Sequence, residues 1–435
     1  MSIHSPVRGA TSRKPLVGAA TAAAALSLVL AGCAGTGGDT PEDTSLTIVW
    51  ESGGKDALDA VIAEFEAANP GYTVEPEYLD APSIQTQMPT RLSAGTAPDV
   101  FRTEAGRGTT MAVQYLVSKG LLAELTGENV TAVPESISDT LSVDGVPYGY
   151  TPVLMAVGQV FNDDSLAASG LEVPTTWDEV LTFCADARAN GTIAFANGPV
   201  TLHENQTVPF ALAGQLVYGE EPDLDEQLAA GETTFADSPW REAIERELEM
   251  VDAGCFPDGF TGEDMFSVID SISTGRTLGM VGYTGYLPYA SKATSTFSLY
   301  PLPGSDDPDE SRLLVAPFAS LSVNAQAANP ELAQKFVDFV ASPEITELYA
   351  ATVSPDGGLL ASDYLTGTAP TTQMGTTIVE YLSAGKTIAF PDAYWPNPEV
   401  QRALQAGVQE LVQGKKTVDD VLNAMQEAQE KGTAD

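Results

Sequence analysis

Apolar residues in the first part of the chain alternate between continuous runs and helical spacing. The run Leu46–Trp50 predicts a short buried strand. The next apolar residues recur three or four positions apart, as on one face of an amphipathic helix: Leu58, Val61, Ile62 and Phe65. Similar patterns predict strands at 72–75 and 99–102 and helices at 85–93 and 110–118. This alternation favours an α/β fold with a parallel sheet covered on both faces.

The rest of the chain carries further helix and strand patterns. Thr176 and Glu179 form a Thr-x-x-Glu capping box, which predicts a helix that starts at Trp177. The stretch Leu313–Val323 is long, apolar and broken by Pro317, which suits a segment that crosses between two lobes. The remaining patterns predict a strand at 277–281 and helices at 239–253, 262–273, 330–340, 399–413 and 417–430.

Length and charge narrow the class of protein. A chain of 435 residues is expected to form two or three packed lobes, and 43% apolar residues are enough to build a core. The chain carries 60 Asp and Glu against 20 Lys and Arg, a formal net charge of −40. Such an acidic surface repels phosphate backbones and anionic bilayers, so we expect neither nucleic-acid binding nor polybasic docking to a membrane.

The N-terminus has the order of a secretory signal. Basic residues precede the apolar stretch Pro15–Leu30, which is short for a bilayer span. Leu30-Ala31-Gly32-Cys33 resembles the bacterial lipobox, so we predict a lipoprotein signal peptide over 1–32 and lipidation of Cys33. The alternative is a chance cysteine after an apolar run. Lipidation would anchor the chain to the extracytoplasmic face of the bacterial cell membrane, through a flexible tether predicted at 33–45.

Two cysteines remain beyond the signal peptide, and the expected compartment is oxidising. Cys184 lies on the apolar face of the helix that starts at Trp177, and Cys255 follows the helix at 239–253. A disulfide between them is expected, the alternative being two separately buried thiols. The processed chain has one histidine, His203, and no Cys-x-x-Cys pair, so a zinc or haem site lacks ligands. We predict neither a metal nor a cofactor.

Seven short motifs follow one another along the chain. They are Phe65–Gly71 (FEAANPG), Ser93–Phe101 (SAGTAPDVF), Gly120–Thr126 (GLLAELT), Asp144–Gly149 (DGVPYG), Phe161–Asp164 (FNDD), Pro174–Glu179 (PTTWDE) and Asn329–Phe339 (NPELAQKFVDF). In this order they resemble the extracellular solute-binding proteins of ABC transporters, in the sugar-binding group that includes the maltose-binding protein. The resemblance extends from Leu46 to about Lys431.

The resemblance implies two α/β lobes joined by crossing strands, with a ligand cleft that closes by hinge motion. The lobes are expected at 46–151 plus 316–354, and at 152–315 plus 355–435. The implied function is capture of a sugar or oligosaccharide and its delivery to ABC permease subunits in the membrane, by a monomer that is not an enzyme. Two alternatives stay open, namely a receptor of the same fold for another solute, such as a polyamine or peptide, and a secreted carbohydrate-active enzyme.

Sugars present apolar ring faces and many hydroxyls, so a sugar site needs aromatic surfaces and convergent polar groups. The resemblance places such groups after the first strand, after the strand at 99–102, and in a loop before a later helix. The residues at these places are Glu51 and Lys55; Arg102, Glu104 and Arg107; and His203, Glu204 and Asn205. The competing interpretations are an ion pair at a helix start, solvated surface charges and a helix cap.

Aromatic candidates come from two further places. The family pattern Gly-x-Trp appears here with Tyr286 at the Trp position and Tyr283 nearby, a departure that weakens any assignment to maltose itself. Tyr394 and Trp395 form an aromatic pair flanked by prolines and are candidates for stacking on a sugar ring. The alternative for this pair is a surface loop that is held in place by burial of its aromatic rings.

Overall fold

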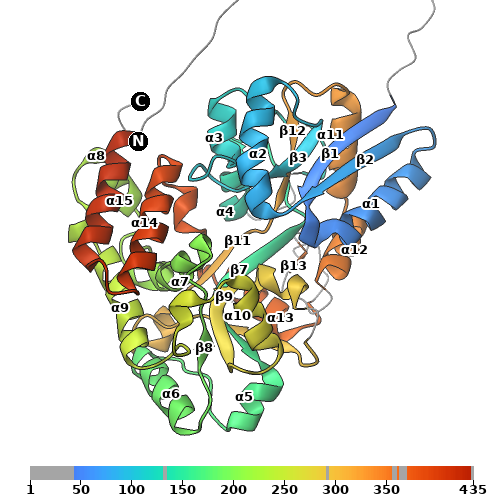
Figure 1. Cartoon of the computed structure of the whole chain (residues 1–435). Coiled ribbons are helices and arrows are strands. Elements are labelled where there is room, and N and C mark those ends of the chain that lie inside the picture. The colour runs from blue at the N-terminus through green and yellow to red at the C-terminus, as the bar shows by residue number, and fades with distance from the viewer. Residues whose placement is uncertain (1–43, 131–134, 291–292, 355–359, 362–369, 433–435) are drawn as a thin grey trace, which may run out of the picture. The chain divides into compact units, whose positions relative to one another are not determined.

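The computed structural model describes residues 44–130, 135–290, 293–354, 360–361 and 370–432 (Figure 1). The chain divides into two compact units, residues 1–42 and 43–435, and every described residue belongs to the second unit. The predicted signal peptide at 1–32, the lipidation site Cys33 and nearly all of the tether lie outside the described residues. Among the described residues, no helix is both long and apolar enough to cross a membrane.

The first sheet has the strand order β2-β1-β3-β12-β4. β1 (Ser45–Glu51) pairs in parallel with β2 (Thr73–Leu79) and β3 (Val100–Thr103), as the alternating pattern predicts. β12 (Ser320–Asn324) is antiparallel to β3 and to β4 (Leu122–Ala123). The prediction of a purely parallel sheet is therefore wrong at this edge, because β12 enters from the second sheet instead of through a helical crossover.

Helices cover this sheet and complete the first lobe. They are α1 (Lys55–Ala68), α2 (Ala81–Ala94), α3 (Val113–Ser118), α4 (Glu135–Ser138), α11 (Pro330–Val340) and α12 (Pro343–Val353). The apolar face predicted for α1 is buried: the Phe65 ring lies 5.1 Å from that of Phe336 on α11, centroid to centroid, and 5.3 Å from that of Phe339. α12, which the sequence analysis did not predict, packs beside α1 (Figure 1).

The second sheet is built around one long strand and runs β14-β11-β7-β9-β8. β7 (Val153–Asn162) pairs antiparallel with β9 (Gly279–Tyr283), β11 (Leu313–Pro317), β10 (Phe297–Tyr300) and β13 (Leu360–Ala361). The edge strands are β8 (Phe195–Ala196), which is parallel to β9, and β14 (Thr387–Ile388), which is parallel to β11. Periodicity does not predict β7, because this strand is buried on both faces and shows no alternation of polar and apolar residues.

The second lobe packs its helices around this sheet. They are α5 (Asp163–Ser169), α6 (Trp177–Ala189), α7 (Thr207–Leu216), α8 (Leu224–Ala230), α9 (Trp240–Asp252), α10 (Met265–Ser273), α13 (Gln373–Ser383), α14 (Pro398–Leu411) and α15 (Val418–Gly432). The predicted capping box forms at α6, where the Thr176 hydroxyl accepts from the Glu179 amide at 3.3 Å. The structure also contains α5, α7, α8 and α13, which were not predicted.

Two chain segments run side by side from one sheet to the other. Tyr150 forms a bridge with Leu321, and the Phe318 amide donates to the Val153 carbonyl at 3.1 Å. The Thr151 hydroxyl donates to the Val153 and Ala319 carbonyls, at 2.7 and 3.0 Å. The stretch Leu313–Val323 therefore passes between the sheets, as its sequence predicts, and crosses at Phe318. The limits of the two lobes along the chain stay a prediction.

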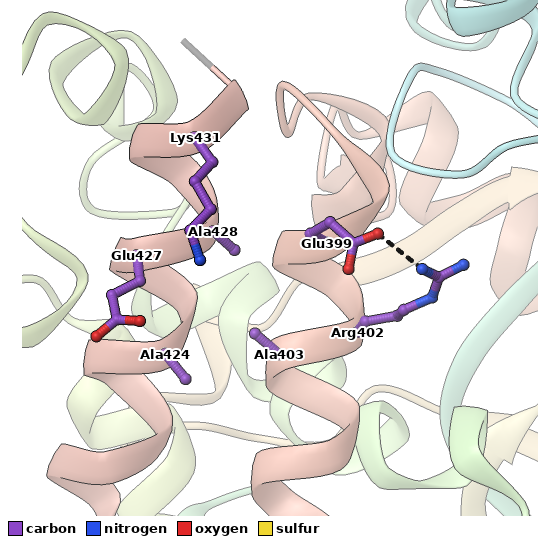
Figure 2. A pocket seen from close by; sticks show the side chains of 7 residues that line it. All are labelled: Glu399, Arg402, Ala403, Ala424, Glu427, Ala428 and Lys431. Carbon is purple, nitrogen blue, oxygen red and sulfur yellow. Dashed lines mark hydrogen bonds and ion pairs between the residues drawn. The ribbon is translucent and has the colours of Figure 1, made fainter. Parts of the chain in front are cut away.

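α14 and α15 lie against each other, and a groove of about 430 Å³ runs along their surface (Figure 2). Its floor is formed by Ala403, Ala424 and Ala428 and its rim by charged side chains. On that rim, the Arg402 guanidinium lies 2.7 Å from the Glu399 carboxylate, one helical turn away on α14. Small residues at this contact allow the two helices to approach closely.

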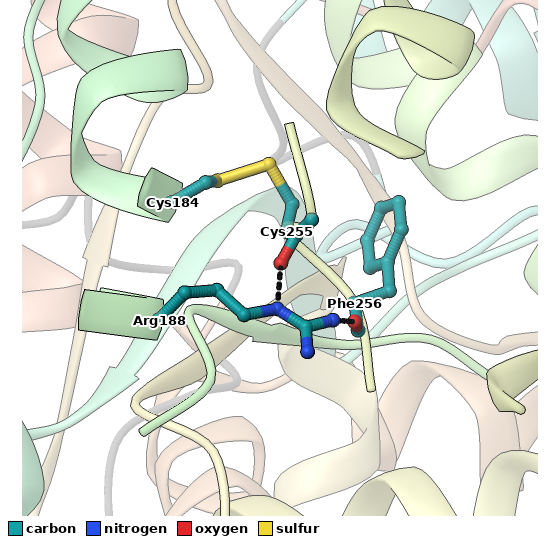
Figure 3. Close-up of a disulfide and its surroundings, with 5 residues drawn as sticks. Cys184, Arg188, Cys255 and Phe256 are labelled. Carbon is teal, nitrogen blue, oxygen red and sulfur yellow. Dashed lines mark hydrogen bonds between the residues drawn. A yellow bond between two sulfur atoms is a disulfide. The ribbon is translucent and has the colours of Figure 1, made fainter. Parts of the chain in front are cut away.

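A disulfide ties α6 to the segment after α9 (Figure 3). Cys184 and Cys255 are fully buried and their Cα atoms are 4.6 Å apart, so the predicted pairing is confirmed and two separate thiols are excluded. Arg188, one turn further along α6, donates to the carbonyl oxygens of Gly254, at 2.8 Å, and Phe256. Hydrogen bonds thus reinforce the covalent link at this corner of the second lobe.

Candidate ligand-binding site

Three charged side chains meet at the carboxyl ends of β1 and β3. Arg102 Nε lies 2.9 Å from Glu51 Oε2, and Arg102 Nη1 lies 2.8 Å from Glu104 Oε1. Residues 51 and 102 are far apart in sequence but meet because parallel neighbouring strands end at the same edge of a sheet. Burial disfavours the charged form of Arg102, yet the two carboxylates hold its pKa above the usual value.

Glu104 is the more accessible of the two carboxylates. Its side chain is 19% exposed, against 7% for Glu51. Burial raises its pKa, but the Arg102 charge and hydrogen bonds from Thr109, Arg102 and Gln85 outweigh burial and keep the pKa below its usual value. Glu104 is therefore a fixed negative charge at the edge of the first lobe.

A row of tyrosines approaches this edge from the second lobe. Tyr283, Tyr286 and Tyr289 recur every third residue, at the end of β9 and along the 3₁₀ helix η6 (Thr284–Tyr289). A 3₁₀ helix has three residues per turn, so these side chains share one face. The Tyr289 hydroxyl donates to Glu51 Oε1 at 3.0 Å, which joins the two lobes directly. The Tyr283 and Tyr286 rings contact each other, 5.3 Å between centroids.

His203 and Glu204 lie beside these tyrosines on the 3₁₀ helix η3 (Leu202–Gln206). The Tyr286 hydroxyl donates to Glu204, and the His203 ring lies 6.0 Å from the Tyr286 ring. Burial raises the pKa of Glu204 to about 7 and lowers the pKa of His203 to about 4. The histidine is therefore neutral at pH 7, and its 4.0 Å approach to the Glu204 carboxyl group is not an ion pair there.

Backbone atoms of the two lobes touch beside these side chains. The Arg107 amide donates to the Ala393 carbonyl at 3.1 Å, and a Cβ on Gly108 would lie 2.0 Å from the carbonyl oxygen of Asp392. Asp392 belongs to the 3₁₀ helix η9 (Pro391–Ala393) and is 9% exposed. Burial and then the Glu104 charge raise the pKa of Asp392 to about 7. The two acidic side chains thus act on each other across the junction of the lobes.

We call these groups the junction cluster. It consists of Glu51, Arg102, Glu104, His203, Glu204, Tyr283, Tyr286, Tyr289 and Asp392. The first three come from the first lobe and the others from the second. Within the described part of the chain, no group of three or more His, Cys, Asp or Glu side chains could hold a metal ion.

Seven of the twelve ligand residues expected from the sequence lie in the junction cluster, and the other five lie outside it. Lys55 pairs with Asp59 on the surface of α1. The Arg107 side chain is exposed and donates to Gln114 at 3.3 Å, although its amide contacts the second lobe. Asn205 is buried and donates to the carbonyls of Pro199 and Leu202, at 3.0 and 2.9 Å, so it acts as a local cap.

Tyr394 and Trp395, the aromatic pair that follows η9, do not belong to the junction cluster. Trp395 is 1% exposed, and its ring lies 5.7 Å from that of Trp240 and 5.8 Å from that of Phe210. The expectation that Trp395 stacks on a sugar is corrected here, because the ring already fills the core of the second lobe. Tyr394 is 44% exposed. The competing interpretation, a surface loop held in place by burial of an aromatic ring, therefore describes Trp395 but not Tyr394.

Sequence reasoning missed Tyr289 and Asp392. A signal existed for Tyr289, because tyrosines at 283, 286 and 289 keep the three-residue period of a 3₁₀ helix. No pattern marked Asp392, one acidic residue among 60 in the chain. Its place beside Gly108 depends on the approach of two lobes, which sequence periodicity does not report.

Comparison of the chain with known proteins identifies the family to which it belongs and proteins of the same fold. The family described as bacterial extracellular solute-binding protein matches residues 51–347. The putative ABC transporter periplasmic-binding protein YcjN of Escherichia coli is 26% identical over 167 residues, which are 36% of this chain and 38% of YcjN. The chain thus aligns with well under half the length of this relative.

Solved structures are similar over most of the chain. RafE in complex with raffinose has a TM-score of 0.73 at 19% identity, covering 88% of this chain and 99% of RafE. A chitin oligosaccharide binding protein has a TM-score of 0.72 at 19% identity, covering 87% and 95%. At these identities the likeness establishes the two-lobe fold.

Proposed function

Because the chain belongs to the family of bacterial extracellular solute-binding proteins, we propose that it captures a sugar or oligosaccharide between its two lobes. The bound solute is delivered to the permease subunits of an ABC importer. The family places the protein outside the cytoplasm. Anchoring through Cys33 after removal of residues 1–32 is part of the proposal, and so is a monomeric state.

The junction cluster is the observation that carries this proposal. It brings hydrogen-bonding groups, including Glu51, Arg102 and Glu104, together with the rings of Tyr283 and Tyr286. Sugar rings need this combination, because their hydroxyls require polar partners and their apolar faces favour aromatic contact. The names of the similar structures, which mention raffinose and chitin oligosaccharide, support the same class of ligand.

Contacts across the junction supply a mechanism of capture. The bonds from Tyr289 to Glu51 and from the Arg107 amide to Ala393 join the lobes on the side where the cluster lies. The paired segments near Thr151 connect the same lobes and are suited to act as the hinge. Rotation about this hinge, with lobes at 46–151 plus 316–354 and 152–315 plus 355–435, would open and close the cluster around a solute.

A binding protein, unlike an enzyme, returns its ligand unchanged. We therefore expect no turnover when the protein is incubated with oligosaccharides that it binds. Release of shorter saccharides, dependent on Glu104 or Glu204, would instead support a carbohydrate-active enzyme, whose chemistry needs two carboxyl groups.

Calorimetric titration of variants tests the location of the site. Arg102→Ala removes the partner of Glu51 and Glu104 and is expected to weaken sugar binding by about 100-fold or more, as for a buried charge-assisted contact. Arg91→Ala is the matched control, because Arg91 lies on α2 of the same lobe and pairs with Glu77 on the surface. Equal affinities in the two variants would place the ligand elsewhere.

A further inference from the structure

Charge in the junction cluster is not balanced. Four carboxyl groups, Glu51, Glu104, Glu204 and Asp392, accompany a single guanidinium, that of Arg102. Arg102 contacts Glu51 and Glu104, both from the first lobe. Among the described residues, Glu204 and Asp392 form no ion pair with a lysine or arginine. The second lobe therefore contributes two buried acidic groups without a permanent cation.

One of these acids has an oxygen that no described residue satisfies. Asp392 is 9% exposed; its Oδ2 accepts from Gln401 at 2.8 Å, whereas its Oδ1 has no hydrogen-bond partner in the part of the chain that the structure describes. A buried acceptor without a donor is unfavourable and is rare in folded proteins. Asp392 lies at the junction of the lobes, because a Cβ on Gly108 of the first lobe would stand only 3.1 Å from the Asp392 Cβ; the charge of Glu104, also from the first lobe, contributes to its raised pKa.

Two neighbouring tyrosines, Tyr283 and Tyr286, interact with these carboxyl groups. Glu104, Glu204 and Asp392 all act on the pKa of the Tyr283 hydroxyl, which burial and these carboxyl groups raise above its usual range. The hydroxyl accepts a hydrogen bond from Gln206 Nε2 at 2.6 Å. The Tyr283 and Tyr286 rings meet at an interplanar angle of 64°. The Tyr286 hydroxyl donates to Glu204 and the Tyr286 ring contacts that of Tyr283, so Glu204 and the two rings lie together, within electrostatic reach of Glu104 and Asp392.

We infer that the sugar bound here carries a basic amine, and that its ammonium group lies among Glu104, Glu204 and Asp392. The inference rests on the proposed function and names the chemical class of its ligand. An ammonium group offers three donors and a positive charge, so it can satisfy Asp392 Oδ1 and compensate the carboxylates together. Tyrosine faces add cation–π attraction. The pKa values of Glu204 and Asp392 are raised to about 7, so these two groups are partly protonated near pH 7. An ammonium group is attracted to their ionised forms, whereas a neutral hydroxyl can donate to Asp392 but gains no such attraction.

Matched pairs of saccharides test the inference by isothermal titration calorimetry. Glucosamine oligomers of two to four units are compared with cello-oligosaccharides of the same length, which carry a hydroxyl where the former carry the amine. Glucose and galactose are compared with glucosamine and galactosamine, and spermidine serves as an amine without a sugar. The amine-bearing member is expected to bind at least about 10-fold more tightly, the preference of a charge-assisted contact over a neutral one.

The possible outcomes separate this inference from the proposed function. Equal or tighter binding of the neutral members overturns the inference and leaves sugar binding intact. Binding of spermidine alone overturns both the saccharide class and the inference. Absence of binding to both members of every pair also overturns the inference as stated.

A conservative substitution provides a second readout. Asp392→Asn keeps the shape of the side chain and an oxygen for Gln401 but removes the charge. We expect this variant to lose about 10-fold in affinity for the amine-bearing sugar, and less than about 3-fold for its neutral counterpart. Asp258→Asn is the control, because the Asp258 side chain is 93% exposed near the disulfide. Equal losses for both sugars in a normally folded Asp392→Asn protein would overturn the inference.

Discussion

Replacement of Gly108 by alanine tests whether the lobes must touch for tight binding. At the present geometry the new Cβ would lie 2.0 Å from the Asp392 carbonyl oxygen and 2.9 Å from its carbonyl carbon. Ordinary contact begins near 3.4 Å, so the two backbones must separate by more than an ångström. Gly108 is not among the glycines with positive φ, and alanine is therefore compatible with its backbone conformation.

The expected loss of affinity follows from the contacts that this separation breaks. The hydrogen bonds from the Arg107 amide to Ala393, 3.1 Å, and from Tyr289 to Glu51, 3.0 Å, both join the lobes, and the first of them comes from the residue that precedes Gly108. At a net value of about 1 kcal/mol each, their loss disfavours the closed state by about 2 kcal/mol. A ligand that binds the closed state should then bind about 30-fold more weakly.

Calorimetric titration and denaturant unfolding together decide the result. Gly262→Ala is the matched control, because a Cβ there meets no atom within 4 Å and its φ is not positive. We expect Gly108→Ala to weaken binding with little change in the free energy of unfolding of the ligand-free protein. Unchanged affinity in Gly108→Ala would refute the argument that contact between the lobes contributes to capture.

Three further predictions concern the second lobe. Replacing Cys184 and Cys255 by serine removes a disulfide between residues that are 71 positions apart and should lower the free energy of unfolding by about 4 kcal/mol. A denaturation midpoint equal to that of the parent protein would contradict this prediction. Trp395→Ala should cost about 3 to 5 kcal/mol of stability through loss of its core contacts and change affinity only indirectly; the reverse, seen by paired unfolding and titration experiments, would return the ring to the ligand site. Burial raises the pKa of Glu247 to about 8, so the Glu247 carboxyl group holds its proton more tightly in the folded state than in the unfolded chain. The stability that comes from the protonated Glu247 is therefore lost as the pH rises from about 4.5 to 8. Glu247→Gln should remove up to about 1.4 kcal/mol per pH unit from that decline, measured by unfolding across this range, and an unchanged slope would show that Glu247 does not titrate there.

Periodicity predicted the elements that have one polar and one buried face. The helix α1 follows from the spacing of Leu58, Val61, Ile62 and Phe65, all of which are buried against the first sheet and its helices. The strand β7 could not be found in this way, because neighbours cover both of its faces and nine of its ten residues are buried. The strand direction of β12 was also beyond local patterns, since it depends on how the chain returns from the second sheet.

The site was predictable where chain topology brings side chains together and unpredictable where lobe packing does. Glu51 and Arg102 end neighbouring parallel strands, so their encounter follows from the order of elements. Trp395 could have faced either a sugar or the core, because an aromatic residue in a loop serves both purposes equally well. Asp392 gains its significance from Gly108 and Glu104 of the other lobe, which no sequence spacing connects to it.

Thermal unfolding of the purified protein in the presence of a broad panel of mono- and oligosaccharides tests the central claim most directly. A sugar that binds the junction cluster, added at a concentration of 100 times its Kd, should stabilise the folded protein by about 2.7 kcal/mol and raise the unfolding temperature accordingly. The account predicts such a rise with at least one saccharide, and its loss in Arg102→Ala but not in Arg91→Ala. No shift with any sugar, or a shift that Arg102→Ala leaves unchanged, would contradict the account.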